Sequence, residues 1–134
     1  INYIYIMIII TFGTFDLLHI GHIKILERAK SLGDKLIVGV STDKFSIEKK
    51  NRPPIYNEND RKQILESLKF VDEVFFEESF EKKREYIKKY KADIFVMGND
   101  WEGRFDEFND VCKVVYFERT PSISTTQIIE KISN

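Results

Sequence analysis

The stretch IIITFGTFDLLHIGH, residues 8–22, joins a short apolar run to a segment that contains both histidines of the chain, His19 and His22. Unbroken Ile-rich runs are typical of strands in parallel sheets, because such strands are covered on both faces. Gly13 lets the chain turn sharply where the run ends and lets a ligand approach the backbone. A helix that begins after this turn offers free N–H groups to an anion. The stretch therefore predicts a strand, a ligand-binding turn and a helix, in that order.

Short apolar runs alternate with helical patterns through the rest of the chain. We expect strands at residues 8–12, 35–40, 73–76, 94–97 and 113–117, and helices at residues 22–30, 58–68, 80–90 and 124–132. Strands separated by helices imply right-handed crossovers and a parallel, doubly wound sheet. The predicted fold is therefore a single-domain α/β structure of the Rossmann-like kind, with about five strands and flanking helices.

The composition is that of an ordinary folded domain. A length of 134 residues corresponds to about one domain, and 43% hydrophobic with 32% charged residues excludes a disordered or low-complexity chain. The formal net charge of -1 provides no overall basic field, so we expect no nucleic-acid partner. The single cysteine, Cys112, cannot form an internal disulfide, which favours a reducing, cytoplasmic location.

The apolar start of the chain, residues 3–10, is far shorter than the ~20 residues that a membrane span requires. It also lacks the basic start and the cleavage site of a signal peptide. We therefore interpret it as a buried strand and expect no membrane contact. We further expect residues 1–6 to be an N-terminal extension before a natural start at Met7, and residues 7–134 to be the folded domain.

Three segments follow predicted strands and should meet at one rim of the sheet: residues 13–22, 98–103 and 119–126. Doubly wound sheets bind ligands at the carboxyl ends of their strands, near the point where the strand order reverses. In the last segment, Ser124 and Gln127 form the S-x-x-Q pattern of a helix capping box, and the helix start that it marks exposes amides that bind anions. We therefore expect this rim to bind an anionic ligand.

The histidine pair has two alternative interpretations. Loop histidines are often simply solvated or hydrogen-bonded. Two histidines together with Asp16 could also ligate zinc, but the sequence has no HExxH motif and Cys112 is far away, so we expect no protein-bound metal. A strand before the pair, Gly21 inside it and a helix after it favour a phosphate-binding role instead.

The motifs on this rim resemble a known superfamily. The segment TFGTFDLLHIGH (residues 11–22) resembles the H-x-G-H signature of the nucleotidyltransferases, and RTPSISTT (residues 119–126) resembles their second signature. Between them, MGNDWEG (residues 97–103) narrows the resemblance to the glycerol-3-phosphate branch of the cytidylyltransferase family. The resemblance extends from Ile8 to about Ile132.

This resemblance implies a reaction and its participants. The fold is then the nucleotidylyl-transferase type, and the substrates are CTP and glycerol 3-phosphate. A phosphate oxygen of the acceptor attacks the α-phosphorus of CTP in line, and pyrophosphate departs. Mg²⁺ would accompany CTP, held mostly by its phosphates, and the enzyme would be a homodimer. Since the attacking phosphate is already ionised, catalysis reduces to positioning and charge neutralisation.

The matching positions give a set of expected site residues. The catalytic residues are His19, His22 and Arg119. Nucleotide binding falls to these two histidines and Arg119, together with Thr14, Phe15, Arg52, Lys69, Asp100, Thr120, Ser124, Thr125 and Thr126. Acceptor binding falls to Asp16, Lys49, Arg61 and Lys83.

Three of these assignments, those of Arg52, Lys69 and Lys83, involve a departure from the family or a simpler interpretation. A second family lysine near Lys49 falls at Asn51, so Arg52 could take its role. Lys69 stands where the family has an arginine, which keeps the charge and loses bidentate geometry. Lys83 lies in the charged run 81–85, whose simplest interpretation is an exposed helix face.

Two other functions stay open at this stage. The same signatures serve enzymes that transfer CMP to choline or ethanolamine phosphate, or AMP to a sugar phosphate. A nucleotide-binding module without turnover is the alternative of another class, although the complete histidine pair argues against it.

Overall fold

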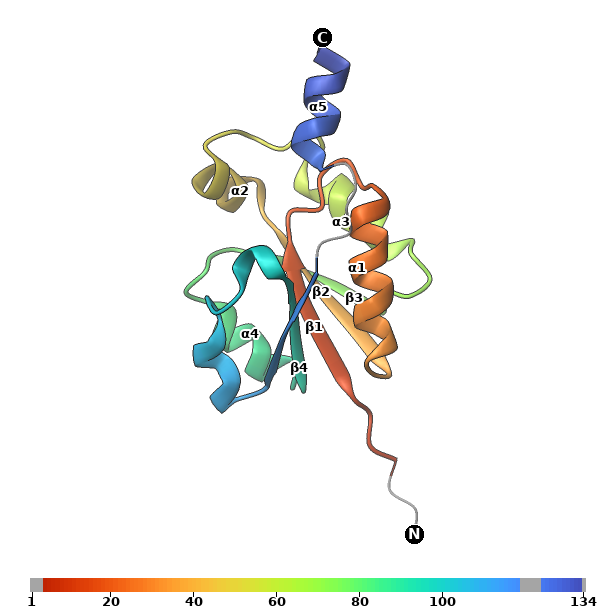
Figure 1. Cartoon of the computed structure of the whole chain (residues 1–134), viewed down its shortest axis with the longest axis vertical. Coiled ribbons are helices and arrows are strands. Elements are labelled where there is room, and N and C mark those ends of the chain that lie inside the picture. Colours follow the sequence, from red (N-terminus) through yellow and green to blue (C-terminus); the bar gives the residue numbers. More distant parts are fainter. Residues whose placement is uncertain (1–3, 119–123, 134) are drawn as a thin grey trace.

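Five parallel strands form one sheet, which confirms the predicted doubly wound α/β fold (Figure 1). The computed structural model describes residues 4–118 and 124–133. The strands are β1 (Ile8–Gly13), β2 (Lys35–Ser41), β3 (Glu73–Glu77), β4 (Ile94–Gly98) and β5 (Lys113–Phe117). Their order is β3-β2-β1-β4-β5, and every neighbouring pair is parallel. The order therefore reverses between β1 and β4, where such sheets bind ligands.

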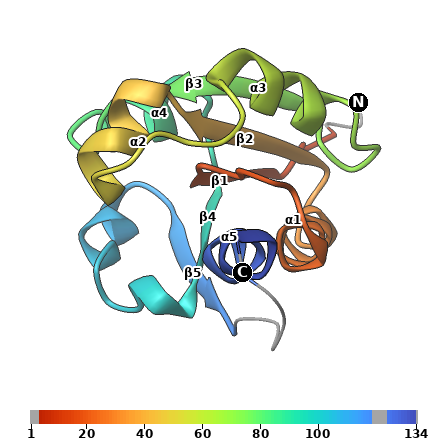
Figure 2. The same ribbon diagram turned by 90° about the horizontal axis from the view of Figure 1, so that it is seen from above.

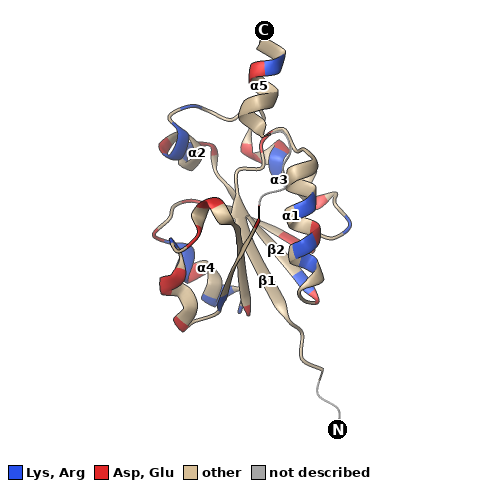
Figure 3. Cartoon of the chain, in the orientation of Figure 1, with Lys and Arg blue, Asp and Glu red and all other residues tan. Residues whose placement is uncertain are grey.

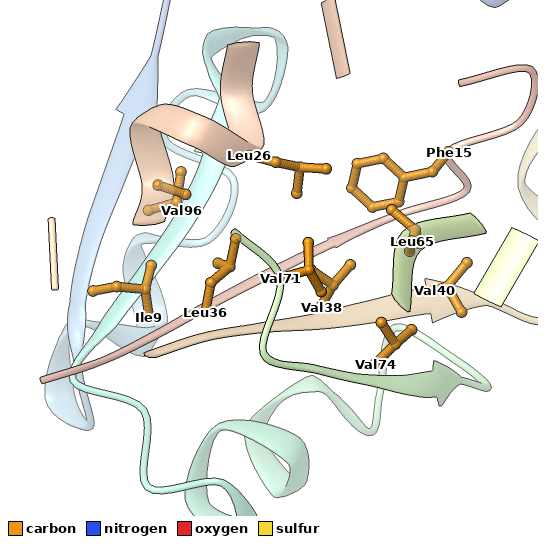
Figure 4. Packing of buried hydrophobic residues seen from close by; sticks show 11 residues of the cluster. Ile9, Phe15, Leu26, Leu36, Val38, Val40, Leu65, Val71, Val74 and Val96 are labelled. Carbon is orange, nitrogen blue, oxygen red and sulfur yellow. The ribbon is translucent and has the colours of Figure 1, made fainter. Parts of the chain in front are cut away.

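Helices cover both faces of this sheet. Residues of α1 (Ile20–Ser31) and α3 (Glu58–Glu66) pack on one face, in a core that includes Leu26 and Leu65 (Figure 4). The other face is covered by α4 (Lys83–Lys89) and the short 3-10 segment η2 (Asp106–Asp110). Strands covered on both faces need apolar residues at consecutive positions, which explains the unbroken Ile and Val runs of β1 and β2.

A helix that the sequence analysis did not predict, α2 (Asp43–Lys50), follows β2 directly. Thr42 caps it: the Thr42 side-chain oxygen accepts a hydrogen bond from the N–H of Phe45 at 3.1 Å. Phe45 is buried, whereas the rest of the segment is mostly charged, so its apolar periodicity was too weak to predict a helix. The helix carries Lys49 and Lys50 in its last turn.

The predicted strand at the start of the chain is partly wrong. β1 begins at Ile8, and Ile4, Tyr5 and Ile6 precede it with exposed side chains. The Tyr5 hydroxyl donates to the Asp93 carboxylate, and at Met7 the backbone joins the body of the protein, because its carbonyl accepts hydrogen bonds from the N–H groups of residues 34 and 35. Among the helices of residues 4–118 and 124–133, none is long and apolar enough to cross a membrane.

The last helix, α5 (Thr125–Ser133), stands above the carboxyl ends of the strands (Figure 2). Its predicted capping box is confirmed. The N–H of Gln127 donates to Ser124 Oγ at 3.1 Å, and the N–H of Ser124 donates to Gln127 Oε1 at 2.8 Å. Thr125 Oγ1 donates to the carbonyl of Asp16 at 2.8 Å, which fixes the first turn of α5 beside the loop after β1.

Candidate active site

A cavity of about 480 Å³ opens at the carboxyl ends of β1 and β4, where the strand order reverses. It is the place at which a doubly wound sheet binds its ligand. Among the residues that line it are many of those predicted from the sequence, namely Thr14, Phe15, Asp16, His19, His22, Lys49, Lys83, Asp100, Ser124, Thr125 and Thr126. The fold thus gathers segments that are more than 100 residues apart in the chain.

The two histidines stack on each other at the start of α1. Their ring centroids lie 3.8 Å apart, and the planes are inclined by 24°. The N–H of Gly21 donates to His19 Nδ1 at 3.0 Å, and the N–H of His19 donates to His22 Nδ1 at 3.2 Å. His19 is thus the N-cap of α1, and the H-x-G-H spacing closes a reciprocal capping box.

These bonds determine which imidazole nitrogens carry protons. A nitrogen that accepts a backbone N–H bond carries no proton itself, so each neutral ring is protonated at Nε2. Burial, together with the smaller effects of His19 and Lys50, lowers the pKa of His22 to about 3. His22 is therefore an uncharged Nε2–H donor at neutral pH, suited to a phosphate oxygen.

The loop between β1 and α1 is held in an unusual backbone conformation. Phe15 and Leu17 have φ angles of 53° and 50°, in the left-handed region that bulky residues rarely adopt. The Phe15 ring packs in the core beside Leu26 and Leu65 (Figure 4). It also lies 5.4 Å from the His22 ring, edge to face. Core packing of Phe15 therefore supports both the strained turn and the position of His22.

Lys49 reaches into the cavity from α2. Its Nζ donates to Ser41 Oγ at 2.7 Å and lies 3.3 Å from Thr14 Oγ1. Burial lowers the pKa of Lys49 to about 8, while the carboxylate of Glu77 acts in the opposite direction. Lys49 is thus a cation whose charge is sensitive to pH near neutrality.

Lys83 is buried, although its sequence neighbours suggested an exposed helix face. Its Nζ forms an ion pair with Glu77 Oε2, and both side chains are almost inaccessible to solvent. The same ammonium lies over the rings of Phe12, Phe80 and Phe105, at 4.5, 4.9 and 5.3 Å from their centroids. The exposed-face interpretation of Lys83 is therefore wrong, and its assignment to the cavity is consistent with the structure.

Two predicted acceptor-binding residues hold the protein chain instead. Arg61 is 1% exposed and does not line the cavity. Its guanidinium donates to the carbonyls of Tyr56, Thr14 and Ser41 at 2.8–3.0 Å and to the carboxylate of Asp43 at 2.8 Å. These partners join three segments around the cavity, which gives Arg61 a supporting position.

Asp16 lines the cavity, but its carboxylate is engaged by the loop of residues 51–57. Its two oxygens accept hydrogen bonds from the N–H groups of Ile55 and Tyr56, at 2.6 and 3.0 Å. The structure therefore shows Asp16 fastening this loop to the turn after β1.

The remaining predicted residues divide into three cases. Arg52 lies at the rim, where its Nη2 is 3.2 Å from Thr126 Oγ1. Lys69 is exposed, follows α3 and does not line the cavity, because the chain there approaches the amino end of β3. Arg119 and Thr120 lie outside the described residues.

The structure adds cavity residues that the sequence analysis did not assign to the site. Lys50, Arg28, Trp101 and Glu77 all line it. Glu77 ends the strand β3, so its place at the carboxyl end of a strand was the signal that could have identified it. Arg28 lies within α1 and carries no comparable signal.

A resident metal does not fit the described part of the cavity. Residues 4–118 and 124–133 contain no group of three His, Cys, Asp or Glu side chains that could hold a metal ion. The carboxylates that line the cavity are those of Asp16, Glu77, Asp100 and Glu118, of which that of Asp16 accepts hydrogen bonds from two amides and that of Glu77 pairs with Lys83. A divalent cation here would depend on oxygen atoms of the ligand, as Mg²⁺ commonly does with nucleotide phosphates.

The fold and cavity define the class of protein first: a doubly wound α/β protein whose cavity at the switch point is lined by N–H donors and ammonium groups, which are groups that bind anions. Comparison with known proteins then identifies the family. The model of the cytidylyltransferase-like family matches residues 10–131, and the chain belongs to this family.

Individual relatives cover nearly the whole chain. It is 53% identical over 125 residues to the glycerol-3-phosphate cytidylyltransferase of Bacillus subtilis. This alignment covers 93% of this chain and 96% of that protein. It is 47% identical over 124 residues to the enzyme of the same name from Staphylococcus aureus, covering 92% and 93%. A solved structure, that of the lipopolysaccharide core biosynthesis protein of Thermoplasma volcanium, superposes with a TM-score of 0.75 at 28% identity, covering 87% of this chain and 99% of that one.

Proposed function

We propose that this protein transfers CMP from CTP to glycerol 3-phosphate, producing CDP-glycerol and pyrophosphate. The observation that carries the proposal is the shared cavity, which is lined by the stacked histidine pair, by the buried Lys83 and by the half-buried Lys49. Relatives that bear this activity in their names share about half of their residues with the chain over nearly its full length.

The chemistry requires charge neutralisation more than proton transfer. A phosphate oxygen of the acceptor attacks the α-phosphorus, the bond to the β-phosphate oxygen breaks, and the electron pair leaves with pyrophosphate. Nε2–H donors on His19 and His22 would bond to phosphate oxygens on which charge grows in the transition state. The neutral state of His22 suits this role, because a donor is needed and no proton has to be exchanged.

The two ends of the cavity would bind the two substrates. The first turn of α5 offers amides without intrahelical partners, and Thr125 and Thr126 add hydroxyl groups for the departing phosphates. On the other side, Lys49 and Lys83 would neutralise the phosphate of the acceptor. Two anionic substrates repel each other, so cations on the acceptor side are needed to bring them together.

Three further features belong to this proposal. Mg²⁺ would accompany CTP and neutralise its phosphates, so EDTA should abolish turnover and added Mg²⁺ should restore it. The family resemblance supports a homodimer, which sedimentation velocity would test. The reaction would take place in the cytoplasm, where a single free thiol such as Cys112 stays reduced.

The decisive assay measures pyrophosphate release from CTP or ATP with glycerol 3-phosphate, choline phosphate, ethanolamine phosphate or a sugar phosphate. We expect release with CTP and glycerol 3-phosphate above all other combinations. Faster release with another pair would assign the cavity to a related transferase. CTP binding without any release would indicate a nucleotide-binding module.

The histidine pair provides the mechanistic test. His19→Ala removes one phosphate donor and the cap of α1, and we expect kcat to fall by about 10²–10³. Lys24→Ala, an exposed substitution on the same helix, should leave kcat within about twofold of the unmodified protein. Equal activity of both variants would refute the role of the histidine.

A further inference from the structure

The carboxylate of Glu77 lies in the cavity without a role in the mechanism described so far. Glu77 ends β3, is 1% exposed and lines the cavity together with Lys49 and Lys83. A buried carboxylate in a site that binds two anions would oppose binding unless cations outnumber it. Its placement therefore needs a physical explanation.

Glu77 connects the two lysines through short polar contacts. Its Oε2 pairs directly with Lys83 Nζ. Its carboxylate is also hydrogen-bonded to Ser41, whose Oγ lies 2.7 Å from Lys49 Nζ. The carboxylate thus stands between the ammonium groups of α2 and α4, which reach the cavity from different elements.

Neither lysine would be easily kept charged without this carboxylate. Moving an ammonium group away from water is costly unless a partner compensates for the lost hydration. Lys83 also lies over aromatic rings, which give only part of the compensation, and the charge of Arg104 acts against its ammonium. The two lysines and Glu77 together carry a formal charge of about +1, which still attracts a phosphate.

We propose that Glu77 is a positioning residue for the acceptor: it keeps Lys49 and Lys83 charged and directed into the cavity, and so sets the affinity for a phosphorylated alcohol. This inference rests on the proposed function. Glu77 acts through the lysines and touches none of the reacting atoms. No general base is required of it, because the attacking phosphate is already ionised.

The charged neighbours of Lys49 predict how the pH dependence should change. From β3 it faces Glu77, from α4 Lys83, from α3 Arg61, and on its own helix Lys50. Its nearest uncharged contacts are the hydroxyls of Thr14 and Ser41. Glu77 is the anion in this group, so its neutralisation leaves Lys49 among cations and lowers the pKa of the ammonium further.

The test compares Glu77→Gln with Glu78→Gln. Glu78 is the next residue in the chain, and its exposed carboxylate pairs with Lys82 outside the cavity, so it controls for loss of a glutamate–lysine pair. The KM values for glycerol 3-phosphate and CTP and the pH profile of kcat/KM for the acceptor are measured for all three proteins. Thermal melting establishes that each variant is folded.

We expect E77Q to raise the KM for glycerol 3-phosphate by roughly 10- to 100-fold and to change the KM for CTP by less than about twofold. In the unmodified protein, kcat/KM for the acceptor should fall as the pH rises through the pKa of Lys49, about 8. In E77Q this fall should occur at lower pH, whereas E78Q should match the unmodified protein. Glu77→Asp, which keeps the carboxylate, should move the fall back towards its original pH.

Equal acceptor KM values and equal pH profiles for E77Q and E78Q would overturn the inference. A parallel rise of both KM values would also overturn it, because that indicates general damage to the cavity. If E77Q does not fold, the double variant Glu77→Gln/Lys83→Met removes both buried charges together. Because Lys83 also lowers the pKa of Lys49, the pH profile should then shift in the same direction but by less.

Failure of the proposed function would look different. In that case the unmodified protein would release no pyrophosphate from CTP and glycerol 3-phosphate. Binding of glycerol 3-phosphate, followed by the fluorescence of Trp101, the single tryptophan of the chain and a residue of the cavity, would still compare E77Q with E78Q. Equal binding by the two variants would then count against Glu77.

Discussion

His22 serves its site in the uncharged state. Its Nδ1 is occupied by a backbone N–H, and burial beside His19 and Lys50 lowers its pKa to about 3. A histidine at this position is therefore no acid–base group near neutral pH, and its use is to donate one fixed hydrogen bond. The same environment that prepares the donor also makes the folded state sensitive to acid.

The stability of the protein should fall as the pH drops below 6.5. In the unfolded chain His22 takes up a proton near its ordinary pKa of about 6.5, whereas the folded protein takes up that proton only near 3. The contribution of His22 to stability is therefore fully present above pH 6.5 and is lost progressively as the pH falls from there towards 3. At pH 5, the lowered pKa of His22 reduces the free energy of unfolding by about 2 kcal/mol relative to neutral pH.

Urea unfolding between pH 5 and 7.5 checks this prediction. His22→Gln, which keeps an N–H donor and cannot titrate, should lose about 2 kcal/mol less over this range than the unmodified protein. Identical pH dependence of the two proteins would show that His22 is protonated in the folded state.

At the scale of elements, the unit formed by β1, its turn and α1 carries most of the site geometry. An added Cβ at Gly13 would lie 2.8 Å from Cε2 of Phe15. That ring supports His22 and reaches into the core between α1 and α3. The absence of a side chain at Gly13 therefore creates the space in which Phe15 can fold back over its own strand.

Gly13→Ala should destabilise the protein by about 1–3 kcal/mol, because the Phe15 ring must move, and should lower kcat by disturbing His22. Gly98→Ala is the matched control at the end of β4. Its Cβ would have Ile25 Cδ1 as its nearest neighbour at 4.0 Å, so stability should change by less than about 0.5 kcal/mol. Chemical unfolding of both variants measures the difference, and equal losses would contradict this account of Gly13.

The strands were predictable from sequence because each is a short apolar run. The structure moves the bounds of the five predicted strands by one residue at most, although the exposed residues 4–6 do not extend β1 as their apolar character suggested. Helix α2 was not predictable in this way, because Phe45 is its main buried apolar residue. The other feature of the sequence that indicates a helix here is Thr42, which caps it. Similarly, the burial of Lys83 depends on Glu77 of another strand. Such pairing is created by the tertiary fold and leaves no pattern in the local sequence.

At the scale of the whole molecule, Arg61 joins the parts that surround the cavity. The sequence, through its resemblance to the family, predicted acceptor binding for Arg61 and Asp16. It could not show that they bond to backbone atoms, because the carbonyls and amides they bind come from distant segments. The helices carry both acidic and basic residues, whose charges largely cancel (Figure 3). The net charge of -1 therefore does not indicate that several cations line the cavity.

Arg61→Lys should lower the free energy of unfolding by about 3 kcal/mol. Lysine keeps the charge but cannot replace four directed hydrogen bonds, and buried carbonyls would lose their donors. Lys62→Gln breaks a partly exposed ion pair with Glu66 on the same helix and should cost less than about 0.5 kcal/mol. Urea titration of the two variants distinguishes a buried connector from an ordinary surface charge, and similar midpoints would contradict the assignment.

The parallel arrangement of the strands also has a practical consequence for anyone who attaches something to this protein. Residues 4–6 approach β1 at the amino end of the sheet, whereas α5 rises from the carboxyl end, beside the mouth of the cavity (Figure 1). An affinity tag or a fused partner placed ahead of β1 would be separated from the substrates by the length of the sheet. The same addition after α5 would follow a helix whose first turn borders the cavity, so fusion partners and surface-immobilisation handles belong at the amino end.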